Sequence, residues 1–184
     1  MAKVIFGLVG PLASGKGTVK KYLEQKYHAK DCRFSTILRD VLDRLDVPTS
    51  RENLQKVSTV LRRTFGEDLL SKAIAKEAAD LDADIVVIDG VRRETDISHL
   101  LSKENFILIA VDADPKIRFQ RLVLRNENAG DDKKTFEQFL HDHESEADRQ
   151  IPTVMKSAKE SVNNDGTLED LYKQMDAIVQ KYMK

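Results

Sequence analysis

A glycine-framed segment with one lysine and one hydroxyl side chain is the part of this chain best equipped for chemistry. It reads Gly-Pro-Leu-Ala-Ser-Gly-Lys-Gly-Thr and spans residues 10–18. The apolar run Val4–Val9 precedes it and a helical pattern from Val19 to Tyr27 follows it, so the segment joins a strand to a helix N-terminus. Backbone N–H groups at such a junction point inward, the helix dipole favours negative charge, and Lys16 adds a mobile cation. The segment therefore predicts a phosphate-binding loop.

The loop departs at one position from the general phosphate-loop motif. That motif has Gly, four residues, Gly-Lys and then Ser or Thr, whose hydroxyl binds Mg²⁺. Here Gly17 stands where the hydroxyl is expected, and Thr18 follows it. We therefore assign the metal-binding hydroxyl to Thr18. The residues predicted to hold the nucleotide phosphates are Gly10, Ala13, Ser14, Gly15, Lys16, Gly17 and Thr18.

A second candidate group is a carboxylate at the end of a buried strand. The run Ile85–Ile88 is apolar and leads directly into Asp89. Ligands of open α/β sheets sit outside the carboxyl ends of the strands, where the first strand also delivers the phosphate loop. We therefore predict that Asp89 and Thr18 hold a Mg²⁺ ion near the phosphates, directly or through water. The alternative is an ordinary acidic residue in a strand-to-helix turn.

Two arginines, Arg92 and Arg93, follow this carboxylate almost at once. Phosphoryl transfer develops charge on the equatorial oxygens of the transferred group, and guanidinium forks match their geometry. We expect one of the two to face the site, and we prefer Arg92. The alternative is a pair of solvated arginines in a turn.

A third set of cations lies on a predicted helix over residues 115–125. Arg118, Arg121 and Arg125 are spaced i, i+3 and i+7, so they share one helix face. The helix leads into the polar segment Asn126–Lys134, which we interpret as a lid that closes over a nucleotide and excludes water. We predict that Arg121 and Arg125 reach the phosphates. A solvated basic face and an ordinary surface loop are the alternatives.

The composition limits the class of protein. The chain has 184 residues, which suits one domain, and its 30 basic and 31 acidic side chains nearly cancel. A dedicated nucleic-acid binder usually has a basic excess, and the longest apolar runs are too short to span a bilayer. Met1–Gly10 lacks a signal-peptide cleavage site, and the single cysteine excludes an internal disulfide. We expect a cytoplasmic monomer or small homo-oligomer that binds neither nucleic acid nor membranes.

Short apolar runs alternate with amphipathic helical patterns along the chain, which predicts a parallel α/β sheet. The predicted strands are 3–9, 31–34, 85–89, 106–111 and 161–163. The predicted helices are 15–27, 36–45, 50–65, 67–81, 94–102, 115–125, 136–148 and 168–183. Capping patterns mark several helix ends, namely Thr49 with Glu52, Thr135 with Gln138, Asp114 before Pro115, and Gly66.

In this order the motifs resemble the nucleoside monophosphate kinase branch of the P-loop kinases, over nearly the whole chain. The likeness is to small adenylate-kinase-like and dephospho-CoA-kinase-like proteins. The segments that carry it are Gly10–Thr18, Phe34–Thr36 with Arg39, Val87–Arg92, the arginine helix with Asp131 and Asp132, and Asn163–Glu169. The resemblance implies an α/β P-loop NTPase three-layer sandwich with a five-stranded parallel sheet, a helical acceptor-binding insertion and a small lid.

The resemblance also implies how the single domain, residues 1–184, is divided. Its core would be 1–35, 82–125 and 150–184, its acceptor-binding region 36–81, and its lid with the following helix 126–149. The residues expected to bind the acceptor are Ser35, Arg39, Arg92 and Arg93. The donor adenine is expected beside Asn164 and Gly166, and Arg121 and Arg125 correspond to the paired lid arginines.

Three departures from these families concern the acceptor side. Arg39 lies four residues beyond Ser35, whereas adenylate kinases have six, so the acceptor pocket is expected to differ in shape. The helix after the lid contains His141-Asp142-His143 and has no arginine before Arg149, although adenylate kinases usually place a phosphate-binding arginine there. Arg33–Thr36 does not match the acidic signature of dephospho-CoA kinases. The two histidines diverge at i, i+2 spacing and are interpreted as surface residues.

Together these observations predict Mg²⁺-dependent transfer of the ATP γ-phosphoryl group to a nucleoside monophosphate. The predicted catalytic residues are Lys16, Asp89, Arg92, Arg121 and Arg125. ATP and Mg²⁺ are the expected cofactors, and a small nucleotide is the expected acceptor. Two alternatives stay open: a hydroxyl-directed kinase of the dephospho-CoA type, and a regulatory ATP-binding or ATPase module without an acceptor.

Overall fold

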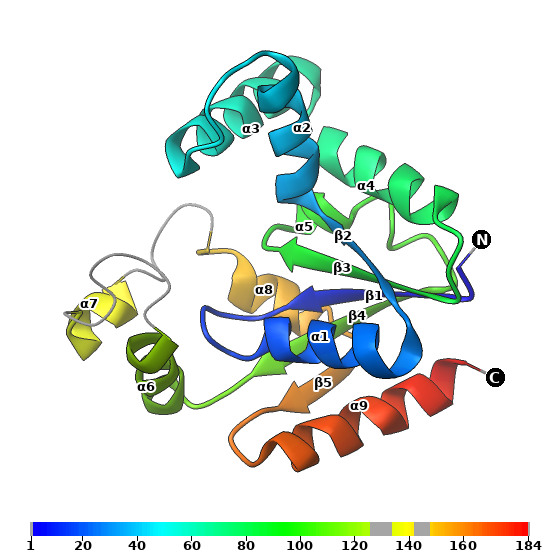
Figure 1. Ribbon diagram of the computed structural model, residues 1–184, viewed down its shortest axis with the longest axis vertical. Coiled ribbons are helices and arrows are strands. Elements are labelled where there is room, and N and C mark those ends of the chain that lie inside the picture. The colour runs from blue at the N-terminus through cyan, green and yellow to red at the C-terminus, as the bar shows by residue number, and fades with distance from the viewer. Residues whose placement is uncertain (1, 126–133, 142–147, 184) are drawn as a thin grey trace.

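A five-stranded parallel β-sheet forms the centre of the protein (Figure 1). The structure is a computed structural model, and it describes residues 2–125, 134–141 and 148–183. The strands lie in the order β2-β3-β1-β4-β5, and each neighbouring pair is parallel. They are β1 (Val4–Val9), β2 (Lys30–Arg33), β3 (Ile85–Val91), β4 (Phe106–Asp112) and β5 (Glu160–Asn163). The predicted fold class is confirmed.

Helices cover both faces of the sheet, which makes three layers (Figure 1). One face is covered by α1 (Lys16–Tyr27) and α9 (Leu168–Tyr182). The other is covered by α4 (Leu69–Asp80), α5 (Glu94–Ile97) and α8 (Ile151–Lys156). The remaining described helices are α2 (Phe34–Arg44), α3 (Arg51–Phe65), α6 (Pro115–Arg125) and α7 (Phe136–His141).

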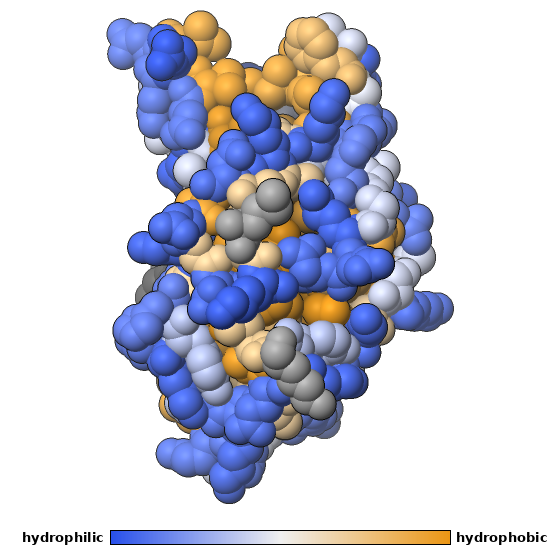
Figure 2. Space-filling model, turned by 90° about the vertical axis from the view of Figure 1, so that its right-hand side faces the viewer, coloured by the Kyte–Doolittle hydropathy of each residue, from blue (hydrophilic) through white to orange (hydrophobic). Residues whose placement is uncertain are grey.

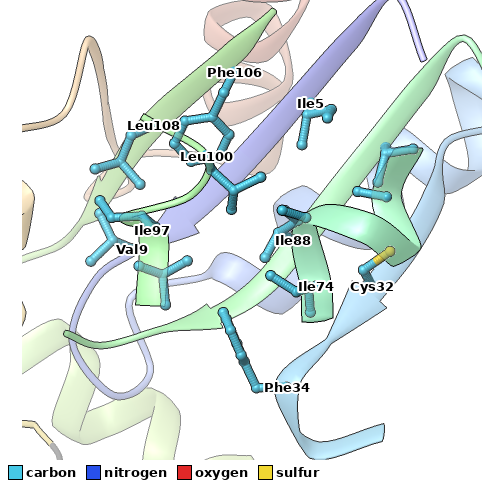
Figure 3. Packing of buried hydrophobic residues seen from close by; sticks show 14 of the residues in the cluster. Ile5, Val9, Cys32, Phe34, Ile74, Ile88, Ile97, Leu100, Phe106 and Leu108 are labelled. Atoms are coloured by element: carbon cyan, nitrogen blue, oxygen red, sulfur yellow. The ribbon is translucent and has the colours of Figure 1, made fainter. Parts of the chain in front are cut away.

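The apolar strands are buried on both faces because successive side chains of a strand point to opposite sides. In β1, Phe6 packs with α1 and α9, whereas Ile5 and Val9 pack on the other face. Figure 3 shows the apolar cluster on the face that α4, α5 and α8 cover. In it, Ile88 of β3 and Ile74 of α4 pack near Phe34 from the start of α2. The sheet is therefore a rigid base that fixes the carboxyl ends of β1, β3 and β4.

Helices α2 and α3 pack on each other and project from one end of the sheet (Figure 1). The face that bears both chain ends is largely hydrophilic, and hydrophobic side chains gather on it near this projecting end (Figure 2). Three large apolar side chains are exposed at this end, namely Leu45 just after α2, and Val60 and Phe65 on α3. The buried residue of α3 is Arg62, which is an unusual choice for a helix interior.

Most predicted elements occur, with shifts at their ends. β3 extends to Val91 rather than Asp89, and α2 begins at Phe34 rather than Thr36. α5 ends at Ile97, where residues 94–102 were expected to be helical, because the chain then turns. The helix expected over 136–148 is described to His141, and residues 142–147 lie outside the described ranges. The sequence patterns did not predict α8, because this helix has only six residues and Pro152 stands near its start.

The caps of the helices were predicted with one error. Ser50, not Thr49, caps α3, and its hydroxyl accepts from the Asn53 N–H at 3.2 Å. The reciprocal bonds between Thr135 and Gln138 are present at 3.2 and 2.9 Å. The other predicted caps are confirmed, with Asp114 accepting from the Lys116 N–H and Gly66 donating to the Arg62 carbonyl.

The described helices contain none that is both long and apolar enough to cross a bilayer. Cys32, the one cysteine of the chain, is buried in β2. Burial raises the pKa of its thiol to about 12, so the sulfur behaves as a small apolar core group rather than a nucleophile.

Candidate phosphate-binding site

The glycine-framed loop runs from the carboxyl end of β1 to the first turn of α1, as predicted. Gly15 has φ 107° and immediately precedes the helix, in a conformation that a side chain disfavours. The loop is also closely enclosed, because a Cβ on Gly10 would lie 2.0 Å from the carbonyl oxygen of Val111. By contrast, a Cβ on Gly17 would meet no atom within 4 Å. The loop is thus packed against the protein on one side and open at the start of α1.

The Lys16 ammonium is held inside this loop. Its Nζ donates to the carbonyl oxygens of Gly10 at 2.7 Å and Pro11 at 2.9 Å. Burial lowers the pKa of Lys16 to about 8, and the negative charge of Asp89 opposes this fall. Burial disfavours the charged form of this lysine, and a bound anion would stabilise that form. This lysine is therefore suited to bind phosphate.

Four charged side chains surround Lys16 closely enough to influence its pKa. Asp89 and Asp148 favour the charged ammonium, whereas Arg92 and Arg118 disfavour it. Arg92 also pairs with Asp148, with 3.3 Å between its Nη1 and the carboxylate Oδ1. The structure therefore brings the predicted residues Asp89 and Arg92 to the loop. It adds Asp148, which sequence reasoning missed because nothing in its local pattern marks it.

Asp89 lies inside β3, half-buried and in register with Arg33 of the neighbouring strand. Gly90 follows with φ 91°, so the chain turns sharply after the carboxylate. Thr18 is half-buried on the first turn of α1, and its N–H donates to the Gly15 carbonyl at 2.9 Å. Within the described ranges, no group of three or more His, Cys, Asp or Glu side chains is placed to hold a metal by itself. A cation at this loop would need ligands from bound phosphates and water.

Arg118 is used differently from the other two arginines of α6. It is buried, its Nε donates to the Ala113 carbonyl at 2.9 Å, and its Nη1 lies 3.4 Å from the carbonyl oxygen of Leu12 in the loop. Its guanidinium also lies over the ring of Phe139. Arg118 thereby ties α6 and α7 to the phosphate loop, which is a structural role that its place in the stripe did not reveal.

Arg121 and Arg125 lie one turn and two turns further along α6. Arg121 is half-buried, and its Nη1 is buried without a hydrogen-bond partner among the described residues. A buried guanidinium nitrogen is costly to leave unpaired, so this atom is a candidate to contact a bound anion. Arg125 is exposed at the end of the helix. The polar segment Asn126–Lys134 lies outside the described residues except for Lys134.

Asn164, expected beside the donor adenine, supports the phosphate loop with its side chain. It is buried, and its Nδ2 donates to the Ser14 carbonyl at 2.8 Å. The amide fills the space beside Gly15, where a Cβ would lie 2.1 Å from the same nitrogen. The connection from β5 to α9 is therefore locked to the loop. Gly166 is exposed in the same connection.

The residues predicted to bind an acceptor lie on two different elements. Ser35 is half-buried in the first turn of α2, and Arg39 is exposed one turn later. Arg93 caps the start of α5, and its N–H donates to Oδ2 of Asp96 at 2.9 Å. Asp96 had no signal in the sequence, because its partners are backbone groups and a distant arginine.

Comparison with known proteins agrees with this geometry. The profile of a family described as the AAA domain matches residues 9–139. The UPF0200 protein TK1334 of Thermococcus kodakarensis is 30% identical, covering 98% of this chain and 100% of that protein. A UPF0200 protein of Thermococcus gammatolerans is 29% identical over 100% of this chain and 96% of its own length.

Two solved structures share the fold at low sequence identity. TT1252 from Thermus thermophilus superposes with a TM-score of 0.67 at 17% identity, covering 98% of each chain. A shikimate kinase from Bacteroides thetaiotaomicron gives a TM-score of 0.62 at 14% identity, covering 97% of each chain. The sheet order, the phosphate loop and these neighbours define the class of α/β proteins with a P-loop kinase fold.

Within that class, the chain belongs to the AAA domain family and to the UPF0200 proteins.

Proposed function

We propose that this protein is a Mg²⁺-dependent phosphotransferase that moves the γ-phosphoryl group of ATP to a nucleoside monophosphate. The observation that supports it most directly is the position of the Lys16 ammonium, which donates to the Gly10 and Pro11 carbonyls inside the phosphate loop, near enough to Asp89 and Arg92 for their charges to shift its pKa. Such a set of groups neutralises the phosphoryl oxygens and holds donor and acceptor in line. No protein nucleophile is required, because positioning and charge compensation supply the rate enhancement.

Each group has a defined part in this proposal. The backbone of the loop and the Lys16 ammonium bind the donor phosphates, and the open side of the loop at Gly17 leaves them room. Arg92 holds the transferred group, and the Arg121 Nη1, which has no hydrogen-bond partner among the described residues, binds a phosphate oxygen. Arg125 and the segment 126–149 would complete the enclosure as a lid.

The residues at the loop fit a Mg²⁺ ion that is bound chiefly by the nucleotide. Mg²⁺ is usually held by one or two protein oxygens together with phosphates and waters. Thr18 and Asp89 supply one hydroxyl and one carboxylate at the carboxyl ends of β1 and β3. When bound, the ion would neutralise charge on the phosphates.

The acceptor is assigned to the region 36–81 and the turn after β3. Arg39 is exposed near the start of α2, and a phosphate monoester carries close to two negative charges near neutral pH. We propose that Arg39 and Ser35 bind this monoester while Arg92 and Arg93 face it from the other side. The buried thiol of Cys32 fits a reducing compartment, and we propose a cytoplasmic location.

A hydroxyl-directed kinase is the second candidate. Two observations favour it: a structural neighbour is titled shikimate kinase, and Asp148 pairs with Arg92 and is near enough to Lys16 for its negative charge to raise the pKa of that lysine. A carboxylate there could accept the proton of an attacking hydroxyl, whereas an acceptor phosphate has no such need.

An acceptor panel distinguishes these functions. ADP release is measured with ATP and Mg²⁺ in the presence of each nucleoside monophosphate, each nucleoside, dephospho-CoA and shikimate. The proposal predicts acceptor-dependent turnover with at least one monophosphate and far less with its nucleoside. Turnover with hydroxyl acceptors alone supports the second candidate, and slow release that ignores every acceptor supports a regulatory ATPase.

A further inference from the structure

A buried ion pair joins α3 to the turn that carries Arg92 and Arg93. Arg62 of α3 is 6% exposed and Asp96 of α5 is 3% exposed. The Nη2 of Arg62 donates to Oδ1 of Asp96 at 2.6 Å, although 34 residues separate them. The other oxygen, Oδ2, accepts the N–H of Arg92 at 3.0 Å and the N–H of Arg93 at 2.9 Å. One carboxylate therefore holds helix α3 and the backbone of both arginines.

The guanidinium of Arg62 also makes a hydrogen bond through its other terminal nitrogen. Its Nη1 donates to the Glu67 carbonyl at 2.6 Å, in the connection between α3 and α4. Its Nε is buried and has no hydrogen-bond partner within the part of the chain that the structure describes. A buried ion pair is often no more stabilising than apolar packing of the same volume, because both charges lose their hydration. We therefore interpret this pair as fixing the relative positions of α3 and α5 rather than as raising the stability of the fold.

We propose that Asp96 and Arg62 are positioning residues that set Arg92 according to the placement of α3. The inference rests on the proposed function, because it takes Arg92 as a phosphate-binding group and α2–α3 as the acceptor-binding region. Asp96 is not proposed to touch a phosphate itself. It fixes the backbone from which the Arg92 side chain reaches the surroundings of Lys16.

The connection gives the acceptor a route to the phosphoryl-transfer site. α2 packs on α3, so an acceptor bound at α2 biases the position of α3. Movement of α3 relative to the sheet must carry Asp96 along or break the 2.6 Å contact from Arg62. In either case the hydrogen bonds from the Arg92 and Arg93 N–H groups to Asp96 change. Arg92 thus keeps its position near Lys16 and Asp148 while α3 keeps its contact with Asp96. When that contact breaks, the backbone of Arg92 is free to move.

Kinetics of four variants test this role, with AMP as the acceptor probe. Arg62→Met and Asp96→Asn each break the connection, while Arg62→Lys keeps a donor to the carboxylate. Arg63→Met is the matched control, because Arg63 is the exposed neighbour on the same helix. We expect the first two variants to lose about tenfold or more in kcat/KM for AMP, with the KM for ATP within about twofold of wild type. Arg62→Lys should recover part of the loss, and Arg63→Met should match the wild type.

A double variant covers the case in which a single variant does not fold. Arg62→Met/Asp96→Asn removes both buried charges, so it leaves no unpaired ion in the interior. Its asparagine oxygen can still accept from the Arg92 and Arg93 N–H groups, but the connection to α3 is gone. We expect it to fold and still to lose kcat/KM for AMP. A folded double variant with wild-type kinetics for AMP overturns the proposal, as does an equal rise in the KM values for AMP and ATP.

Amide hydrogen exchange gives a readout that does not require turnover. In the protein without nucleotide, the Arg92 and Arg93 amides should exchange at least about tenfold faster in Asp96→Asn or Arg62→Met than in Arg63→Met. Unchanged protection in folded Arg62→Met contradicts the coupling even if the kinase is active. If the wild type fails to turn over any acceptor while these amides lose protection as expected, the proposed function fails and the coupling of α3 to the arginine turn stands.

Discussion

Lys16 should make the stability of the protein depend on pH in a specific direction. Burial in the loop lowers the pKa of its ammonium from 10.5 to about 8. That fall corresponds to about 3 kcal/mol of unfavourable free energy for the charged form in the folded protein. Below pH 8 the lysine is protonated in both the folded and unfolded states, so the full penalty applies. Between pH 8 and pH 10.5 the folded protein releases the proton first, and the penalty disappears.

The comparison with Lys16→Met isolates this effect, because methionine has similar length and no charge. The free energy of unfolding of the wild type, relative to the variant, should rise by about 3 kcal/mol from pH 7 to above pH 10.5. Urea denaturation of the protein without nucleotide, at steps of pH, measures it. Lys21→Met is the matched control, because Lys21 is exposed on the same helix. A flat difference between wild type and Lys16→Met, or one of opposite sign, would refute the argument that this ammonium is held at a cost to stability.

Three further predictions concern the loop and its surroundings. Asp89→Asn should weaken Mg²⁺-dependent activity more than Mg²⁺-free nucleotide binding, and identical Mg²⁺ titrations of the two proteins would make the residue structural. Arg39→Ala should raise the acceptor KM about 10–150-fold with the ATP KM nearly unchanged, since a charge-assisted contact is worth about 1.5–3 kcal/mol; loss of ATP affinity alone would count against the acceptor assignment. Gly15→Ala should lower the stability of the fold, because its Cβ would lie 2.1 Å from Asn164 Nδ2 at φ 107°, whereas Gly17→Ala should fold as the wild type does; equal stability of the two variants would contradict the packing of the loop.

Local sequence patterns were sufficient to predict a parallel α/β sheet, and the family resemblance implied its three-layer arrangement. The runs Val4–Val9, Ile85–Ile88 and Phe106–Val111 are apolar throughout, which is typical of strands buried on both faces, and all three are central strands of the sheet. The phosphate loop was equally visible, because its glycines and lysine follow one another in the chain. Element ends were less certain, since they depend on tertiary contacts. α2 begins two residues early because Phe34 is drawn into the core.

The candidate site was only partly predictable, for a physical reason. Lys16 and Arg92 follow strands whose carboxyl ends must meet, and Asp89 lies near the carboxyl end of one of them, so their approach could be inferred. The contacts of Arg62 with Asp96 and of Asn164 with Ser14 join residues far apart in the chain, and such contacts leave no periodic or local signature. Arg118 shares a helix face with the two phosphate-binding candidates, Arg121 and Arg125, but its spacing did not reveal that its guanidinium is bound to backbone carbonyls.

Direct detection of phosphoryl transfer tests the central claim most simply. The protein is incubated with Mg²⁺, ATP labelled in its γ-phosphate and a nucleoside monophosphate, and the products are separated and identified by mass. We expect a labelled nucleoside diphosphate, formed at a rate that falls about 10²–10⁴-fold in Lys16→Ala. Labelled inorganic phosphate as the sole product with every monophosphate, or an undiminished rate in Lys16→Ala, would contradict it.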